Sequence, residues 1–95
     1  MLTIEIKDHT LYLNGALQVH HLEGIKGELV DLAAEDESVT VDLSGIEEMD
    51  MAGLQMLLSF LRSRKNETRV TGITADMARA LEITGLKPHM APYMR

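Results

Sequence analysis

Three carboxylates in the middle of the sequence are the first candidates for chemistry. Glu47, Glu48 and Asp50 lie within a stretch of four positions. General acid–base catalysis needs a buried carboxylate with a shifted pKa beside a pocket, whereas acids in a short polar stretch are usually solvated. The sequence also has neither a phosphate-binding glycine loop of the P-loop type nor a Gly-x-Ser-x-Gly nucleophile turn. We therefore expect no catalytic residues, and we predict that the chain is not an enzyme.

The hydroxyl and imidazole groups of the sequence also give no indication of a reactive centre. Ser44 and Thr74 could each accept a phosphate group, but a serine in a loop commonly bonds its own backbone and a threonine before a helix caps it. His20 and His21 are adjacent, and neither has a ligand-type residue four positions later. The chain has no cysteine, which excludes thiolate zinc sites and disulfides. We expect no metal ion and no cofactor.

A basic cluster stands out against an acidic background. Arg62, Arg64, Lys65 and Arg69 could contact a phosphate group or an acidic partner, or they could be solvated charges at a helix end. The whole chain has 15 acidic and nine basic residues, giving a formal charge of −6, and only two Tyr and one Phe. Such a chain repels phosphate backbones and offers few stacking platforms. Nucleic acid is therefore not an expected partner.

The N-terminal residues do not resemble a signal peptide, because no basic stretch precedes an apolar one. No apolar run approaches the ~20 residues that a membrane helix needs. We expect a soluble, cytoplasmic protein without direct insertion into a membrane.

The spacing of apolar residues predicts the elements that must position these groups. Alternation with a period of two is typical of strands, and recurrence every three or four positions is typical of helices. Asp50 stands where a helix N-cap belongs, Thr74 can cap a later helix, and Gly85 followed by Leu86 is typical of a Schellman-type helix end. Asp8 and His9 indicate a tight turn that joins the first two strands into a hairpin. The predicted elements are strands at 2–7, 11–13, 39–43 and 69–73, a loop at 44–49, and helices at 19–34, after Asp50 and after Thr74.

This pattern predicts an α/β fold in a single domain over residues 1–95. The expected order is β-β-α-β-α-β-α, with a mixed β-sheet and helices packed mainly on one face. Residues 87–95 contain two prolines and no clear period, so we expect an irregular tail.

The stretch from Val41 to Leu54 resembles the STAS domain family (sulfate transporter and anti-sigma factor antagonist). In that family a strand ending Asp-Leu-Ser is followed by a short loop, and Asp-Ser-Ser-Gly-Leu or Asp-Thr-Ala-Gly-Leu then opens a helix. Here the strand ends with residues 42–44, and the helix opens with Asp-Met-Ala-Gly-Leu at residues 50–54. Residues 14–17 and 81–86 are similar to two further family features. The resemblance covers roughly residues 2–87.

One departure from the family pattern concerns regulation. The residue before the motif glycine is often the serine or threonine that a partner kinase phosphorylates in anti-sigma factor antagonists. Here that position is Ala52, and its neighbour is Met51, so neither side chain carries a hydroxyl. The resemblance therefore implies a module without the usual phosphoswitch.

The resemblance also implies a function and a binding face. We expect a regulatory protein-interaction module of bacterial signalling and transcription regulation, with a kinase-like anti-sigma factor or a related signalling protein as partner. The alternative is a small STAS subunit that stabilises the ATPase of a lipid-trafficking ABC transporter, as short members of the family do. Met51 is either a core residue or an exposed, adaptable contact, and the glycine before Leu54 permits close backbone approach. The expected partner-binding residues are Ser44, Asp50, Met51, Ala52, Gly53 and Thr74.

Overall fold

The computed structural model describes residues 2–18, 27, 38–64 and 67–94. The predicted first helix, at 19–34, lies outside the described residues except for Gly27, which is helical. The remaining predicted elements can be compared with the structure directly.

A β-hairpin opens the chain. β1 (Leu2–Lys7) and β2 (Thr10–Leu17) pair antiparallel, with Lys7 opposite Thr10. Asp8 and His9 form the tight turn with φ values of 50° and 63°, the left-handed backbone that a two-residue hairpin turn of type I′ requires at both positions. The sequence predicted this turn correctly, but β2 does not stop at Asn14. It continues because Gly15, with φ of 105°, takes up an irregularity in the pairing instead of ending the strand.

β3 (Val39–Met49) is longer than predicted and forms the centre of the sheet. It pairs in parallel with β2 on one side and with β4 (Thr68–Thr71) on the other, so the four-stranded sheet is mixed, in the order β1-β2-β3-β4. The prediction of a loop at 44–49 was wrong. In this stretch Gly45, Ile46, Glu48 and Met49 have ladder partners in the second half of β2, which a search for alternation along β3 alone does not detect.

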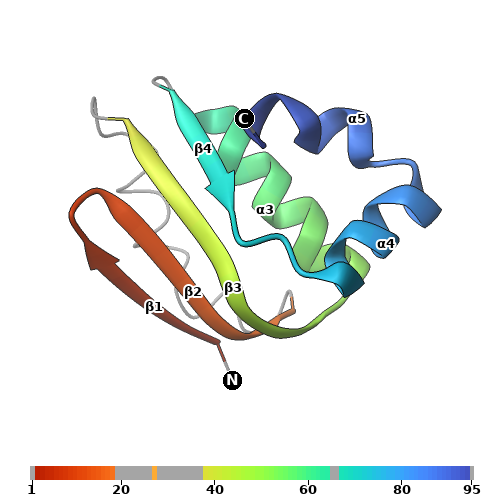
Figure 1. The fold of residues 1–95 in the computed structure, drawn as a ribbon, viewed down its shortest axis with the longest axis horizontal. Coiled ribbons are helices and arrows are strands. Elements are labelled where there is room, and N and C mark those ends of the chain that lie inside the picture. The colour runs from red at the N-terminus through yellow and green to blue at the C-terminus, as the bar shows by residue number, and fades with distance from the viewer. Residues whose placement is uncertain (1, 19–26, 28–37, 65–66, 95) are drawn as a thin grey trace.

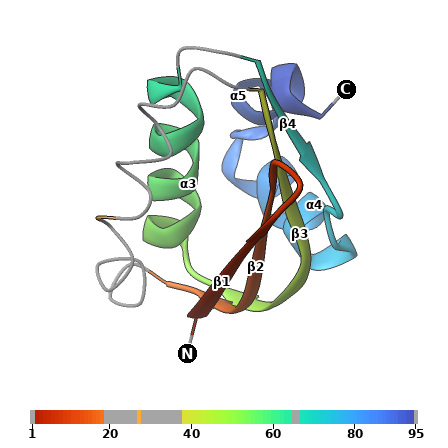
Figure 2. The same ribbon diagram turned by 90° about the vertical axis from the view of Figure 1, so that its left-hand side faces the viewer.

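The helices pack mainly on one face of the sheet. α3 (Met51–Ser63) lies against the strands, while α4 (Ala75–Thr84) and the short α5 (Lys87–Met90) lie beyond the β4 edge, beside α3 (Figures 1 and 2). Side chains from the sheet, from α3 and from the C-terminal turns form one core. Its most deeply buried large members are Leu11, Leu13, Leu17, Val41, Leu43, Leu54, Leu61, Met77, Leu81 and Met90.

The C-terminal residues are more ordered than the sequence indicated. Residues 87–90 form α5 and Ala91–Tyr93 form a 3₁₀ turn, η2. Gly85 ends α4 in the left-handed conformation, and the N–H of Leu86 donates to the carbonyl of Leu81, which closes the predicted Schellman-type ending. The two prolines fit within the first residues of these turns, where no helical N–H bond is lost.

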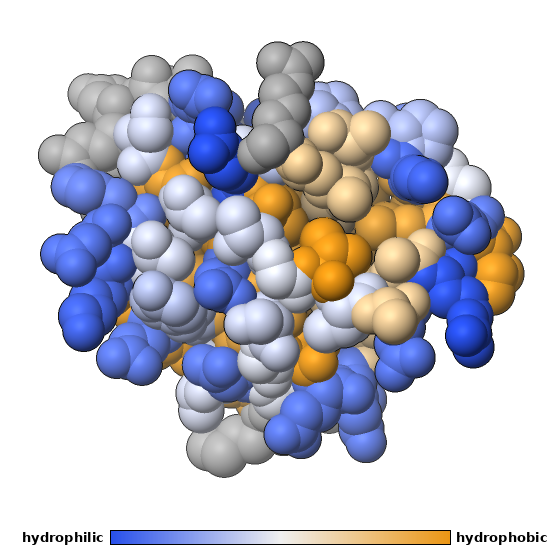
Figure 3. Space-filling model, in the orientation of Figure 1, coloured by the Kyte–Doolittle hydropathy of each residue, from blue (hydrophilic) through white to orange (hydrophobic). Residues whose placement is uncertain are grey.

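The outer face of the sheet is exposed and unevenly polar. Hydrophilic side chains cover the part over β1, β2 and β3, whereas hydrophobic side chains gather beside β4, toward α4 and α5 (Figure 3). The apolar faces of the strands are therefore directed toward α3, as the alternation of buried positions in β3 also shows.

Candidate functional site

The connection from β3 into α3 forms a tightly held corner, which we call the β3–α3 corner and define as residues 50–53. Asp50 is the N-cap of α3, and its Oδ1 accepts a hydrogen bond of 2.6 Å from the N–H of Gly53. The backbone N–H of Asp50 donates to the carbonyl of Leu17 at 3.1 Å. The predicted capping role of Asp50 is confirmed, and the corner is anchored to β2 as well as to its own helix.

Gly53 is needed at this corner for an internal reason. A Cβ atom at this position would lie 2.1 Å from the carbonyl oxygen of Leu17 and 3.0 Å from Oδ1 of Asp50. The close backbone approach that glycine permits is therefore made by β2 of the same chain. Gly53 itself is buried, and Leu17 occupies the space beside it.

The two side chains between the cap and the glycine face outward. Met51 is 41% exposed, and Ala52 is also exposed. Of the two interpretations of Met51, the structure therefore favours the exposed one over the core one. A flexible, polarizable thioether on a rigid first helical turn is suited to contacts with a partner surface.

The two predicted hydroxyl sites are engaged within the chain. Ser44 lies on β3, where both its backbone N–H and its hydroxyl donate to Oδ1 of Asp42, at 2.8 and 2.6 Å. Thr74 caps α4, and its hydroxyl oxygen accepts from the N–H of Met77 at 3.2 Å. Thr74 thus caps its helix as predicted, whereas Ser44 lies on a strand and bonds the Asp42 side chain instead of the backbone of a loop.

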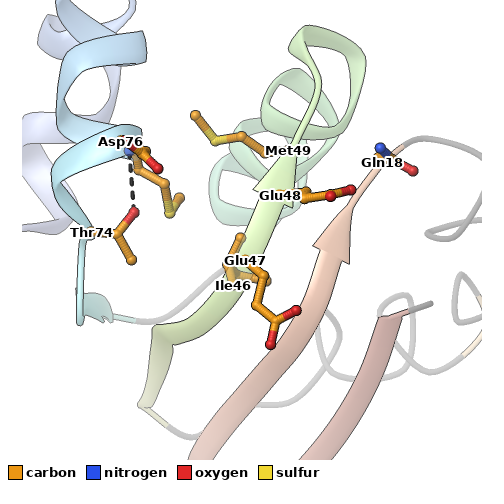
Figure 4. Close-up of a pocket in the computed structure, with 8 residues that line it drawn as sticks. Gln18, Ile46, Glu47, Glu48, Met49, Thr74 and Asp76 are labelled. Atoms are coloured by element: carbon orange, nitrogen blue, oxygen red, sulfur yellow. Dashed lines mark hydrogen bonds between the residues drawn. The ribbon is translucent and has the colours of Figure 1, made fainter.

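A cavity of about 440 Å³ lies between the end of β3 and the start of α4. Figure 4 shows Met49 directed toward the start of α4, and Glu48 directed toward Gln18. The cavity brings Thr74 into one site with the end of β3, whereas Ser44 and the residues of the β3–α3 corner do not line it. Its lining consists of Gln18, Ile46, Glu47, Glu48, Met49, Thr74, Asp76 and Met77.

Sequence reasoning missed most of these lining residues. The predicted order of strands and helices could have indicated part of this site, because the carboxyl ends of neighbouring parallel strands and the starts of the helices that follow them lie at one edge of a sheet. β2, β3 and β4 end on the side where α3 and α4 begin (Figure 1). The extension of β3 to Met49 hid this arrangement, because those residues were expected to form a loop.

The site has carboxylates but lacks the grouping of ligands that a metal ion needs. Glu47, Glu48 and Asp76 all line the cavity and are exposed. Among the residues that the structure describes, no group of three or more His, Asp or Glu side chains is placed to hold a metal ion.

The fold and the corner define a class of protein. The chain belongs to the STAS domain family: the family model described as "Mlab, STAS domain" matches residues 2–92. A comparison with curated proteins found no match.

Three of the solved structures that are similar to this chain are structures of anti-sigma factor antagonists. An anti-sigma factor antagonist from Mycobacterium paratuberculosis superposes with a TM-score of 0.73 at 18% identity, over 93% of this chain and 80% of that one. The antagonist SpoIIAA in its unphosphorylated form gives 0.67 at 16% identity, over 100% of this chain and 87% of the other. The Bacillus cell fate determinant SpoIIAA in its phosphorylated form superposes with a TM-score of 0.68 at 17% identity, over 100% of this chain and 89% of that one. At these identities the likeness shows the fold.

None of the helices in the described part of the chain is both long enough and apolar enough to cross a membrane.

Proposed function

We propose that this chain is a regulatory protein-interaction module of the anti-sigma factor antagonist type, acting in the cytoplasm by binding and not by catalysis. Its partner face is the β3–α3 corner together with the start of α4. The observation that carries the proposal is the exposure of Met51 and Ala52 on a helical turn fixed from both sides by Asp50 and Leu17. A preordered surface loses little conformational entropy on binding.

The proposed module works without the phosphoswitch of its relatives. Position 52 is an alanine, so phosphoryl transfer at the family's usual residue has no acceptor oxygen. The two hydroxyls that the sequence singled out, on Ser44 and Thr74, are engaged with Asp42 and with the backbone N–H of Met77. In this proposal, the corner permanently presents the unphosphorylated surface to a kinase-like or signalling partner.

The absence of a hydroxyl group at Ala52 also favours a second candidate function. A small STAS subunit that stabilises the ATPase of an ABC transporter needs a constant surface and no phosphorylation. Met51 and Ala52 supply such a surface equally well. Capture of the partner from the native cell and its identification by mass spectrometry separates the candidates. For an ATPase partner, loss of the interaction should also lower ATP turnover.

The variant Ala52→Glu tests whether the corner is the partner face. Ala52 is exposed in the first turn of α3, where a carboxylate meets the positive end of the helix dipole, so stability should hold or rise by about 0.3–1 kcal/mol. The same carboxylate adds bulk and charge to the proposed interface. A desolvated acid in an interface typically costs several kcal/mol, so affinity for the captured partner should fall by more than about a hundredfold.

Ser59→Glu is the matched control, because Ser59 is exposed on the same helix two turns further along. It adds the same charge outside the proposed face and should leave affinity within about twofold. Calorimetry or surface plasmon resonance gives both affinities, and urea unfolding gives both stabilities. If Ala52→Glu folds and binds as tightly as Ser59→Glu, the partner face lies elsewhere.

A further inference from the structure

We propose that a second pocket, at the opposite end of α3 from the β3–α3 corner, binds the phosphate group of a small phosphomonoester. The pocket has a volume of about 280 Å³. It lies where α3 ends, β4 begins and the C-terminal turns return to the sheet (Figure 1). We call it the arginine pocket. Its lining consists of Leu61, Arg62, Arg64, Glu67, Thr68, Arg69, Pro92 and Tyr93.

A buried arginine forms the most rigid part of this pocket. Arg64 follows the last residue of α3 and is only 7% exposed, although arginine is rarely buried in folded proteins. Its Nε donates to the hydroxyl of Thr68, which is also 7% exposed, at 3.0 Å. This bond limits rotation of the guanidinium plane and holds it as a fixed part of the pocket lining.

Two exposed arginines extend the pocket from different elements. Arg62 comes from the last turn of α3, and its Nη2 donates to Nδ1 of His89, at 3.0 Å, in α5. Arg69 comes from β4, and no hydrogen bond or ion pair joins its side chain to another described residue. Three arginines, from the end of α3 and from β4, thus line one pocket.

The local charge is opposite to that of the whole protein. The pocket lining that the structure describes holds three arginines and one carboxylate, Glu67, whereas the chain as a whole has a formal charge of −6. A cation at a helix C-terminus can simply complement the helix dipole. That explanation covers Arg62, but it does not account for Arg69, which belongs to a strand.

The chemistry of the pocket selects the ligand class. Guanidinium groups match the planar, bidentate geometry of phosphate and carboxylate oxygens. A phosphomonoester carries about −1.5 to −2 charge and three acceptor oxygens at pH 7, so it can accept hydrogen bonds from more than one arginine at once. The half-buried Tyr93 and the exposed Pro92 add an apolar side, and a volume of about 280 Å³ suits a small organic phosphate.

This site is separate from the proposed partner face. α3 has 13 residues and is therefore about 20 Å long. The β3–α3 corner lies at its N-terminal end and the arginine pocket at its C-terminal end (Figure 2). Failure of one proposal leaves the other intact.

The test is a titration of the ¹⁵N-labelled full chain with inorganic phosphate and then with glycerol 3-phosphate at constant ionic strength. The Nε–H resonances of Arg62, Arg64 and Arg69 should shift and saturate together, while that of Arg79, exposed on α4, stays still. Arg69→Gln should weaken binding of both ligands by about tenfold. Arg79→Gln, which removes the same charge from an exposed position outside the pocket, should change it by less than about twofold.

A further variant tests the sign of the effect. Glu67→Gln removes the pocket's carboxylate and should strengthen phosphate binding by about threefold, which general loss of structure would not do. The proposal is overturned if phosphate shifts no arginine resonance, if Arg69→Gln and Arg79→Gln behave alike, or if acetate binds as tightly as phosphate. It is also overturned if the chain pellets with vesicles of phosphatidic acid but does not bind glycerol 3-phosphate.

Discussion

Asp50 and Gly53 shape the β3–α3 corner through contacts with their own chain. The carboxylate of Asp50 caps α3 at 2.6 Å, while the missing side chain of Gly53 lets the helix start pass against the carbonyl of Leu17. The family motif at this position therefore has a structural function first. The neighbouring Met51 and Ala52 are then held in fixed, outward-facing positions, which is what the proposed partner face requires.

The variant Gly53→Ala should destabilise the protein by about 3 kcal/mol, the upper end of typical overpacking costs. The added Cβ would lie 2.1 Å from a backbone carbonyl, and a paired strand cannot easily move away. Urea unfolding of the variant measures the change. Gly27→Ala is the control: its Cβ would meet nothing within 4 Å, so stability should hold or rise by up to about 1 kcal/mol. Equal effects of the two variants would show that the contact with Leu17 does not constrain this position.

α3 has the rotational phase that its leucine spacing predicts. Leu57 and Leu61 are 3% and 1% exposed, while Gln55 and Arg62 are exposed. This phase also explains why the two proposed sites lie on one helix without interfering with its packing. The leucine stripe faces the sheet, and the ends of the helix carry the polar groups.

The variant Leu57→Ala should lower the free energy of unfolding by about 2–5 kcal/mol, because it leaves a cavity between α3 and the sheet. Gln55→Ala, two residues earlier on the exposed side, should change it by no more than about 0.5 kcal/mol. Chemical denaturation with circular dichroism detection is sufficient for the comparison. A small effect at Leu57 would contradict the packing of α3 described above.

The packing of the whole molecule depends on its last residues. Met90 in α5 is fully buried and belongs to the same core as Leu81 and Met77 of α4. The C-terminal turns also place Tyr93 in the same pocket as the arginines of α3 and β4. A segment with no clear pattern in the sequence therefore closes the core beyond the β4 edge and completes the arginine pocket.

The variant Met90→Ala should cost about 2–5 kcal/mol of unfolding free energy, as for other large-to-small changes in a core. Met94→Ala, four residues later, removes a side chain that is 38% exposed and should cost no more than about 0.5 kcal/mol. Thermal and urea unfolding of both variants provide the measurement. If Met90→Ala is as mild as Met94→Ala, the C-terminal turns do not contribute to the core.

Local chemistry along the chain was sufficient to predict the hairpin turn at Asp8, the cap at Asp50 and the phase of α3. These features depend on residues within a few positions of each other, so periodicity and capping preferences carry the information. The order of the predicted strands and helices then indicated the mixed α/β fold.

Contacts between distant residues were decided by the tertiary structure. The second half of β3 is a strand because β2 offers it partners, Gly53 is required because Leu17 lies against it, and Met90 is buried because α4 and α5 fold back onto α3. The arginines formed a cluster in the sequence, but only the packing of α3, β4 and the C-terminal turns makes them one pocket. Each of these outcomes depends on the relative placement of whole elements, which is set by burial of their apolar faces against one another and has no local signature.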